Sequence, residues 1–252
     1  MNLILLEPGE VGGDCGVTLS GARADHLRHV LHVEPGHEVR IGVVDGPRGV
    51  GTVAAVGDNS VVLRCALDTD TPPRPSIDLL LAVPRPKVMR RLWAQIAALG
   101  VGRIILTNAD KVERNYFDSH ILAEETYRPL LIEGLQQARD TRLPIVTIHR
   151  QFKVLVEDQL DDLFGTGLRM VADPSASAPL SDVVRGSEER ILLAIGPEGG
   201  WNAFELGLLA AHGFKPAGMG PRTLRTDTAT VALLAIAHSA RGHSDFRRQI
   251  SD

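Results

Sequence analysis

Residues 191–200 read Ile191-Leu192-Leu193-Ala194-Ile195-Gly196-Pro197-Glu198-Gly199-Gly200, an apolar run that ends in a loop of proline and glycine. A continuous apolar run is typical of a strand that is covered on both faces of a parallel sheet. The glycines allow the following backbone to turn sharply and to approach a ligand closely. The stretch therefore predicts an α/β fold in which a loop at the carboxyl end of a buried strand binds a polar ligand. A sharp turn without a ligand is the alternative that this motif alone leaves open.

A second motif, at residues 219–229, reads Met219-Gly220-Pro221-Arg222-Thr223-Leu224-Arg225-Thr226-Asp227-Thr228-Ala229. Its Gly-Pro pair predicts a turn, and its threonines can cap the helix that we expect at 228–240. Asp227 falls in the first turn of that helix, where a negative charge is favourable. Because the helix sequence is apolar on all sides, we expect it to be buried. A cation at the mouth of a buried helix needs a partner, so Arg225 is a candidate functional residue.

A proline-rich stretch divides the chain into two predicted domains. Thr71-Pro72-Pro73-Arg74-Pro75 favours an extended connection, so residues 72–76 are expected to form a linker. Residues 1–71 hold short β-branched segments between turn residues, which predicts a small β-barrel. Residues 77–252 alternate strand-like and helix-like segments, which predicts a mainly parallel α/β sheet. The expected strands are 3–6, 37–44, 50–56, 61–67, 77–83, 103–106, 145–148, 168–172, 191–195 and 216–219, and the expected helices are 22–31, 88–99, 119–138, 152–160, 203–211 and 228–240.

The composition is that of an ordinary globular protein. Hydrophobic residues make up 44% of the chain, charged residues 23% and aromatic residues only 4%, which argues against a single-strand binder built on stacked bases. A net charge of −4 gives no general attraction to nucleic acid, so any RNA binding must depend on a local patch. The basic cluster contains Arg74, Arg85, Lys87, Arg90 and Arg91. On charge alone a solvated helix face is the better interpretation, and a phosphate-contacting rim is the alternative.

Cysteines, histidines and the N-terminus indicate neither a metal site nor a membrane. Cys15 and Cys65 form no C-x-x-C pair, which favours reduced thiols in a cytosolic protein. His26, His29 and His32 would spiral around a helix and lack a fourth ligand, so we expect no metal. The N-terminal apolar run is too short for a signal peptide, and no stretch approaches the roughly 20 apolar residues of a membrane span. We therefore expect a cytoplasmic protein that does not associate with membranes.

The two loop motifs resemble those of the SPOUT methyltransferases, whose cofactor site lies in a trefoil knot. More closely, they resemble the RsmE family, which methylates N3 of a uridine in small-subunit ribosomal RNA. The usual family pattern is GPEGGF followed by LGxRILRTETA, where this chain has Trp201, Met219, Thr223 and Asp227 in place of Phe, Leu, Ile and Glu. Residues 26–39 also resemble the PUA-like barrel of that family. The segments around Ala98 and at 136–140 depart from the family pattern, on the side of the substrate.

The resemblance implies a SPOUT domain with a C-terminal trefoil knot, preceded by a PUA-like β-barrel domain that binds RNA. It implies S-adenosylmethionine (SAM) as cofactor, 16S ribosomal RNA or the small ribosomal subunit as partner, and a homodimer. Backbone and apolar groups from several loops would hold SAM. The cofactor-binding residues that it implies are Val171, Ala172, Leu193, Ile195, Gly196, Gly199, Gly200, Met219, Gly220, Leu224 and Thr226.

Methylation at N3 of uridine requires loss of a weakly acidic N–H, and the resulting charge spreads over the ring oxygens. Positioning and stabilisation of that charge are therefore the tasks of the protein. We assign the uracil anion to Arg225, the ribose or phosphate to Arg222, and the role of base or organiser to Glu198, with Asp227 in reserve. The expected RNA-binding residues are Arg28, Arg85, Lys87, Arg90 and Arg91.

Two other functions fit parts of the sequence. The same fold could methylate a ribose 2′-hydroxyl of RNA, which would place the methyl group on the sugar. A non-catalytic RNA-binding protein of this fold would have no affinity for SAM, and the intact motif at 196–200 argues against it. A nicotinamide dehydrogenase is weaker still, because the chain lacks a complete G-x-G-x-x-G after a strand.

Overall fold

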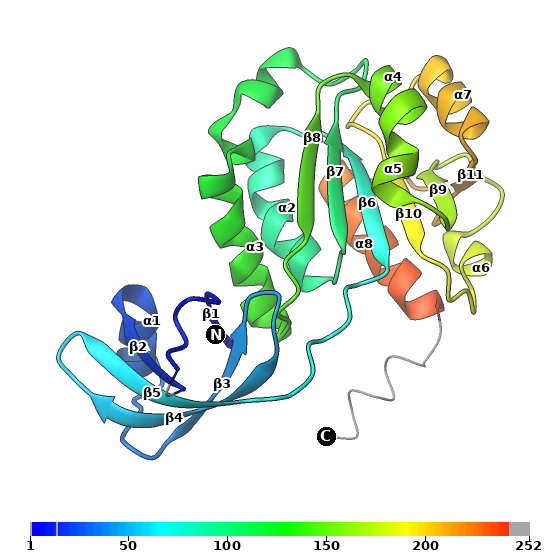
Figure 1. The fold of residues 1–252 in the computed structure, drawn as a ribbon. Helices are drawn as coiled ribbons and strands as arrows, with labels where there is room; N and C mark the ends of the chain where they lie inside the picture. Colours follow the sequence, from blue (N-terminus) through cyan, green and yellow to red (C-terminus); the bar gives the residue numbers. More distant parts are fainter. Residues whose placement is uncertain (1, 14, 242–252) are drawn as a thin grey trace. The chain divides into compact units, whose positions relative to one another are not determined.

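The computed structural model describes residues 2–13 and 15–241, and the chain divides into two compact units (Figure 1). The first unit comprises Met1–Arg74 and Pro129–Leu143, and the second comprises Pro75–Arg128 and Pro144–Asp252. The division after Arg74 falls within the linker expected at 72–76, whereas the sequence analysis had placed 129–143 in the second domain. Residues 242–252 of the predicted second domain lie outside the described residues.

The first unit is built on a curled, five-stranded mixed sheet in the order β1-β3-β4-β5-β2. Its strands are β1 (Ile4–Leu6), β2 (Gly16–Ser20), β3 (Glu38–Val43), β4 (Arg48–Val56) and β5 (Ser60–Leu67). Only β1 and β3 pair in parallel, and the buried side chains of Leu6, Leu19, Ile41 and Leu63 fill the core. The sequence analysis missed β2. The helix expected at 22–31 is instead a short α-helix, α1 (Gly21–Asp25), followed by a π-helical turn, η1 (His26–Val30).

The second unit confirms the predicted α/β fold with a parallel sheet. Its six strands lie in the order β11-β9-β10-β6-β7-β8, and each pair is parallel. The strands are β6 (Ile77–Ala82), β7 (Arg103–Thr107), β8 (Ile145–His149), β9 (Leu168–Ala172), β10 (Ile191–Ile195) and β11 (Phe214–Ala217). β9 and β10 have the predicted bounds; β10 is buried along its whole length, whereas only Met170 and Val171 are buried in β9. β11 begins earlier than predicted.

Helices cover both faces of this sheet. In Figure 1, α2 and α8 lie on one face, and α4 and α5 lie on the other. The helices and turns of the second unit are α2 (Pro86–Ala98), η2 (Arg114–Asp118), η3 (His120–Leu122), α4 (Phe152–Val154), η4 (Leu155–Gln159), α5 (Leu160–Phe164), α6 (Leu180–Val183), α7 (Ala203–Ala211) and α8 (Thr226–Ala240). A further helix, α3 (Glu124–Ala138), begins in the second unit, and its residues from Pro129 onward belong to the first. The helix predicted at 119–138 begins only at Glu124, because two 3₁₀ turns precede it. Within the described part of the chain, no helix has the length and apolar character of a membrane span.

The expectation that α8 is buried on all sides is wrong. Its buried face carries Thr230, Leu233, Leu234 and Ala237. Ala235 is exposed, and neighbouring apolar residues are only half-buried. A helix that lies on a sheet buries one stripe of its surface, so the apolar residues on its outer face stay accessible.

A buried ion pair ties the start of β6 to the chain just before β10. Asp78 has no exposed surface, and its Oδ2 lies 2.8 Å from Nη2 of Arg190. Burial raises the pKa of the Asp78 carboxyl above its ordinary value, while the Arg190 guanidinium partly opposes this shift. A raised pKa means that the fold disfavours the ionised carboxylate, so stability falls as the pH rises through that pKa.

We expect Arg190→Met to destabilise the fold near neutral pH. The loss should be about 3 kcal/mol, the low end for breaking a buried pair, because Arg190 is partly exposed. The loss should shrink in mildly acidic solution, where Asp78 takes up a proton and the buried charge disappears. Urea unfolding at the two pH values measures both effects.

The double variant Asp78→Asn/Arg190→Met is the control. It removes the buried charge together with its partner and should recover most of the lost stability. A loss of equal size at both pH values would contradict this account of the pair.

Candidate functional site

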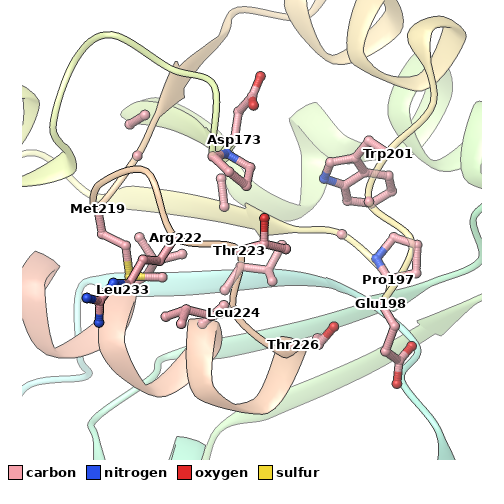
Figure 2. Close-up of a pocket in the computed structure, with 18 of the residues that line it drawn as sticks. Asp173, Pro197, Glu198, Trp201, Met219, Arg222, Thr223, Leu224, Thr226 and Leu233 are labelled. Atoms are coloured by element: carbon pink, nitrogen blue, oxygen red, sulfur yellow. The ribbon is translucent and has the colours of Figure 1, made fainter.

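The main pocket of the second unit lies at the carboxyl ends of β9, β10 and β11. It is formed by the loops that follow these strands and by one side of α8. Figure 2 shows Met219 and Arg222 on one side of the pocket, and Glu198 and Trp201 on the other. The lining residues are Ala172, Asp173, Pro174, Ile195, Gly196, Pro197, Glu198, Gly200, Trp201, Leu206, Ala217, Gly218, Met219, Gly220, Arg222, Thr223, Leu224, Thr226, Ala229 and Leu233.

The backbone at Ala217 and Gly218 passes through the loop 173–180. The N–H of Asp173 donates to the carbonyl of Ala217 at 3.1 Å, on one side of the passing chain. On the other side, the N–H of Gly218 donates to Ala178 O at 3.0 Å, and its carbonyl accepts from Leu180 N at 2.8 Å. Both limbs of the loop are therefore bonded to the same short segment. This threading is the crossing that a trefoil knot requires.

A glycine at position 218 makes the crossing possible. A Cβ atom there would lie 3.1 Å from the carbonyl oxygen of Asp173, which is tighter than an ordinary contact. Backbone atoms form this wall, so it cannot move aside as a side chain would. After Gly218 the chain continues through residues 219–225 into α8, and it carries the second sequence motif into the wall of the pocket.

The first motif forms a tight turn at the end of β10. The N–H of Gly200 donates to Pro197 O at 2.8 Å, and Gly200 has a φ of +70°, a conformation that favours glycine. Gly196 lies against the indole of Trp201, where a Cβ would be 3.1 Å from Nε1. Trp201 itself is only 8% exposed, and its ring centroid lies 5.2 Å from that of Phe152. Its Nε1–H has no acceptor among the described residues. Figure 2 shows the indole nitrogen on the edge that faces the pocket.

Contacts from neighbouring loops fix the conformation of this turn. Glu198 accepts a 3.3 Å hydrogen bond at Oε1 from the backbone N–H of Arg85, which precedes α2. Lys111 donates to Gly199 O at 2.7 Å, and its side chain covers Gly199. Glu205, which is 3% exposed, accepts from the N–H groups of Asp110 and Asn202, each at 2.7 Å. The loops after β6, β7 and β10 are therefore tied together.

Asp227 connects the start of α8 with α2. Its Oδ2 lies 2.6 Å from Nη2 of Arg91, and its Oδ1 accepts from Thr228 N at 3.0 Å. Burial alone would raise the pKa of Asp227, but the hydrogen bonds from Arg91 and Thr228 N–H outweigh it and lower the pKa. Asp227 is therefore an ionised structural anchor, consistent with its predicted place in the first helical turn.

Arg225 lies outside the pocket wall. Its side chain is 72% exposed, and its Nε lies 3.6 Å from Oδ1 of Asp227. The sequence analysis expected a cation held at the mouth of a fully buried helix. Since α8 leaves its outer face accessible and Arg225 is its N-cap residue, the guanidinium reaches solvent. Of the other two predicted catalytic residues, Glu198 and Arg222 both line the pocket, on opposite sides (Figure 2).

The structure brings most of the predicted cofactor-binding residues into one pocket. Those that line it are Ala172, Ile195, Gly196, Gly200, Met219, Gly220, Leu224 and Thr226. Val171 and Leu193 do not line it, because both side chains are buried within their strands. Gly199 lies under Lys111 instead.

The predicted RNA-binding residues have different surroundings. Arg28 belongs to the first unit, and its Nη1 lies 4.0 Å from Asp25. Arg91 forms an ion pair with Asp227, which gives it a structural role between α2 and α8. Arg85, Lys87 and Arg90 lie at the start of α2 and form no ion pair within the described residues.

Sequence reasoning missed several residues of the pocket wall. Trp201 follows the first motif directly, and its position was the signal that could have identified it. Leu233 lies two helical turns beyond Thr226, so helical spacing could have placed both on one face. Ala217 was also missed, because it contacts the backbone of Asp173 across the sheet and no local pattern in the sequence indicates this contact.

Comparison with known proteins gives consistent results. The RNA methyltransferase domain family matches residues 71–238. Ribosomal RNA small subunit methyltransferase E of Treponema pallidum is 30% identical, covering 94% of this chain and 90% of that protein. Ribosomal RNA small subunit methyltransferase E 1 of Borreliella burgdorferi is 25% identical, covering 95% of this chain and 98% of that protein.

A solved structure has the same fold. The crystal structure of ribosomal RNA small subunit methyltransferase E from Neisseria gonorrhoeae, bound to S-adenosyl methionine, matches with a TM-score of 0.74 at 21% identity. The match covers 93% of this chain and 95% of that chain. Together with the family match over more than half of the sequence, these likenesses settle the relationship. The chain belongs to the ribosomal RNA small subunit methyltransferase E family of RNA methyltransferases.

Proposed function

We propose that this protein transfers the methyl group of SAM to N3 of a uridine in 16S ribosomal RNA. The observation that carries the proposal is the pocket at the knot crossing, where both sequence motifs meet beside Glu198 and Arg222. Family membership supports SAM as the methyl donor and small-subunit ribosomal RNA as the acceptor. Because ribosomal RNA is the substrate, we infer that the protein acts in the cytoplasm.

The residues of the pocket fit SAM. Apolar side chains of Ile195, Met219, Leu224 and Leu233 offer a surface for a flat ring. The backbone of the glycine-rich turn and of the loop that follows β11 also lines the pocket, so N–H and C=O groups there are candidates to bond the ligand. A Cβ at Gly196 would meet Trp201, so the space beside this glycine, here called the cradle, exists only because the residue has no side chain. Such a space allows a ligand to approach the backbone closely.

Bound SAM would supply an electrophilic methyl group, and the chain must prepare the uridine nitrogen to accept it. The N3–H proton has to leave before or during transfer, and Glu198 is the candidate to receive or orient it. The backbone N–H of Arg85 holds that carboxylate at 3.3 Å. Arg222 lies on the opposite side of the pocket (Figure 2), and its proposed role is to bind ribose or phosphate. Arg225 is proposed to approach the charged uracil oxygens from outside the pocket, which suits a ligand that arrives from solvent.

We further propose that the protein is a homodimer in which the outer face of α8 is buried. The apolar residues on that face support this assignment: Ala235 is exposed, Val231 and Ile236 are half-buried, and a partner subunit would cover all three. The first unit, with its curled sheet, is proposed to bind RNA, and Arg28 is its candidate contact.

Gly196→Val should weaken SAM binding by at least about tenfold, because the added side chain meets Trp201 and narrows the cradle. Isothermal titration calorimetry measures the dissociation constant. Gly207→Ala in α7 is the matched control, since a Cβ there meets nothing within 4 Å. Undiminished binding by Gly196→Val would show that the cofactor does not use this cradle.

Arg225→Ala should lower the rate of methyl transfer to unmethylated small ribosomal subunits by about 10²–10³-fold, as expected for loss of one charge-stabilising donor. SAM affinity should not change, because Arg225 does not line the pocket. The rate is measured with radiolabelled SAM, and Arg185→Ala, an exposed arginine paired with Asp182, is the control. Near-normal turnover of Arg225→Ala would remove it from the mechanism.

Ala235→Glu should convert the dimer to a monomer, because it places a charge on the apolar outer face of α8. Sedimentation velocity gives the oligomeric state. Ala210→Glu, at an exposed position of α7, is the matched control and should leave the dimer intact. If Ala235→Glu sediments as the unsubstituted protein does, the proposed dimer interface is elsewhere.

A further inference from the structure

A second cavity lies at the carboxyl ends of β7 and β8, beside the main pocket. Its volume is about 360 Å³, within the range of about 300–1,000 Å³ that is typical of ligand pockets. Its walls come from the loop after β7 and from the starts of α4 and α7. Phe152 lines this cavity and packs against Trp201, which lines the main pocket, so the two cavities share a wall. None of the roles assigned above uses it.

Phe204 gives this cavity an aromatic platform. It is 60% exposed at the start of α7, and no other phenylalanine, tyrosine or tryptophan in the described ranges 2–13 and 15–241 is exposed. Because most of its side chain is outside the core, packing of the core does not require a phenylalanine at this position. An accessible phenylalanine on a cavity wall is suited to stacking on a nucleic-acid base, because every base presents a flat π-face.

Polar groups around the platform suit a nucleotide. Asn108 lines the cavity, and its Oδ1 atom is buried and accepts no hydrogen bond from any described residue, which leaves an unsatisfied acceptor at the cavity wall. Arg114 forms no ion pair within the described residues, and Lys153 has only a 3.8 Å pair with Glu157, where both side chains are well exposed. Asp110 also lines the cavity, and its carboxylate suits the amino edge of a base.

The cations near this cavity follow neighbouring strands of the sheet. Strands β10, β6, β7 and β8 are neighbours in that order, and Glu198, Arg85, Arg114 and Lys153 belong in turn to the segments that follow these strands. Positive charge on three neighbouring segments suits the phosphates of a short single-stranded segment that leads away from Glu198.

We propose that this cavity binds a nucleotide of the ribosomal RNA that flanks the target uridine. Phe204 stacks on its base, Asn108 and Asp110 contact the base edge, and Arg114 and Lys153 contact phosphates. The inference rests on the proposed function, because it assumes an RNA substrate whose reacting base lies at the main pocket. It explains how a chain of negative net charge holds RNA, since the necessary cations belong to neighbouring segments.

The test is fluorescence anisotropy with a short, fluorescein-labelled single-stranded RNA that contains uridines. Phe204→Ala should weaken binding by about 5- to 150-fold, the effect of losing one stacked base, and Phe204→Tyr should retain most of the affinity. Arg114→Gln should reduce the slope of log K against log salt by about 0.7, the value for one phosphate contact on a single strand. Arg185→Gln is the charge-matched control, and SAM affinity should not change in any of these variants.

Three results would overturn the inference. They are unchanged RNA binding by Phe204→Ala, an equal loss in Phe204→Tyr, and a change of oligomeric state in Phe204→Ala, which would make this face a subunit contact. Methyl transfer by the unsubstituted protein to small ribosomal subunits tests the proposed function separately. If that transfer occurs while Phe204→Ala keeps the normal KM for subunits, only the flanking-nucleotide site fails.

Discussion

The pocket depends on one backbone crossing, at which residues 217–218 pass through the loop 173–180. Hydrogen bonds on both sides hold this segment, so the loops after β9 and β11 cannot separate without breaking them. The crossing brings the motif at 219–229 against the turn at 196–200, although β11 and β10 are not neighbours in the sheet. A knotted backbone therefore positions two loops with a rigidity that side-chain contacts alone would not provide.

Carboxylate side chains make further contacts that hold the loops around the pocket in place, and two of these carboxylates have a structural role. Glu205 satisfies two backbone N–H groups from different loops, and Asp227 joins α2 to α8 through Arg91. Glu198, by contrast, is exposed to the pocket and has one weak backbone donor at 3.3 Å. This difference in surroundings is the physical reason for assigning the proton-handling role to Glu198 and an anchoring role to Asp227.

Sequence reasoning predicted the fold where local patterns determine it. The apolar runs of β9 and β10 gave correct bounds, because polar or turn-forming residues flank them on both sides. β2 was missed, because only two apolar residues, Val17 and Leu19, alternate with Gly, Thr and Ser in this segment. The crossing at Gly218 involves residues distant in sequence, and composition carries no signal of a knot. The exposure of Arg225 could not be predicted, because it depends on which face of α8 is buried. Tertiary packing determines that face. The succession of cations from Arg85 to Lys153 requires the strand order before it can be seen.

The most direct test is nucleoside mass spectrometry of 16S ribosomal RNA. Unmethylated small ribosomal subunits would be incubated with the purified protein and SAM that carries a deuterated methyl group, and the RNA digested to nucleosides. The account predicts deuterium in 3-methyluridine and in no other nucleoside. Label on a ribose 2′-oxygen would contradict the proposed reaction, and the absence of any label would contradict the assignment of the knot-crossing pocket as a methyltransferase site.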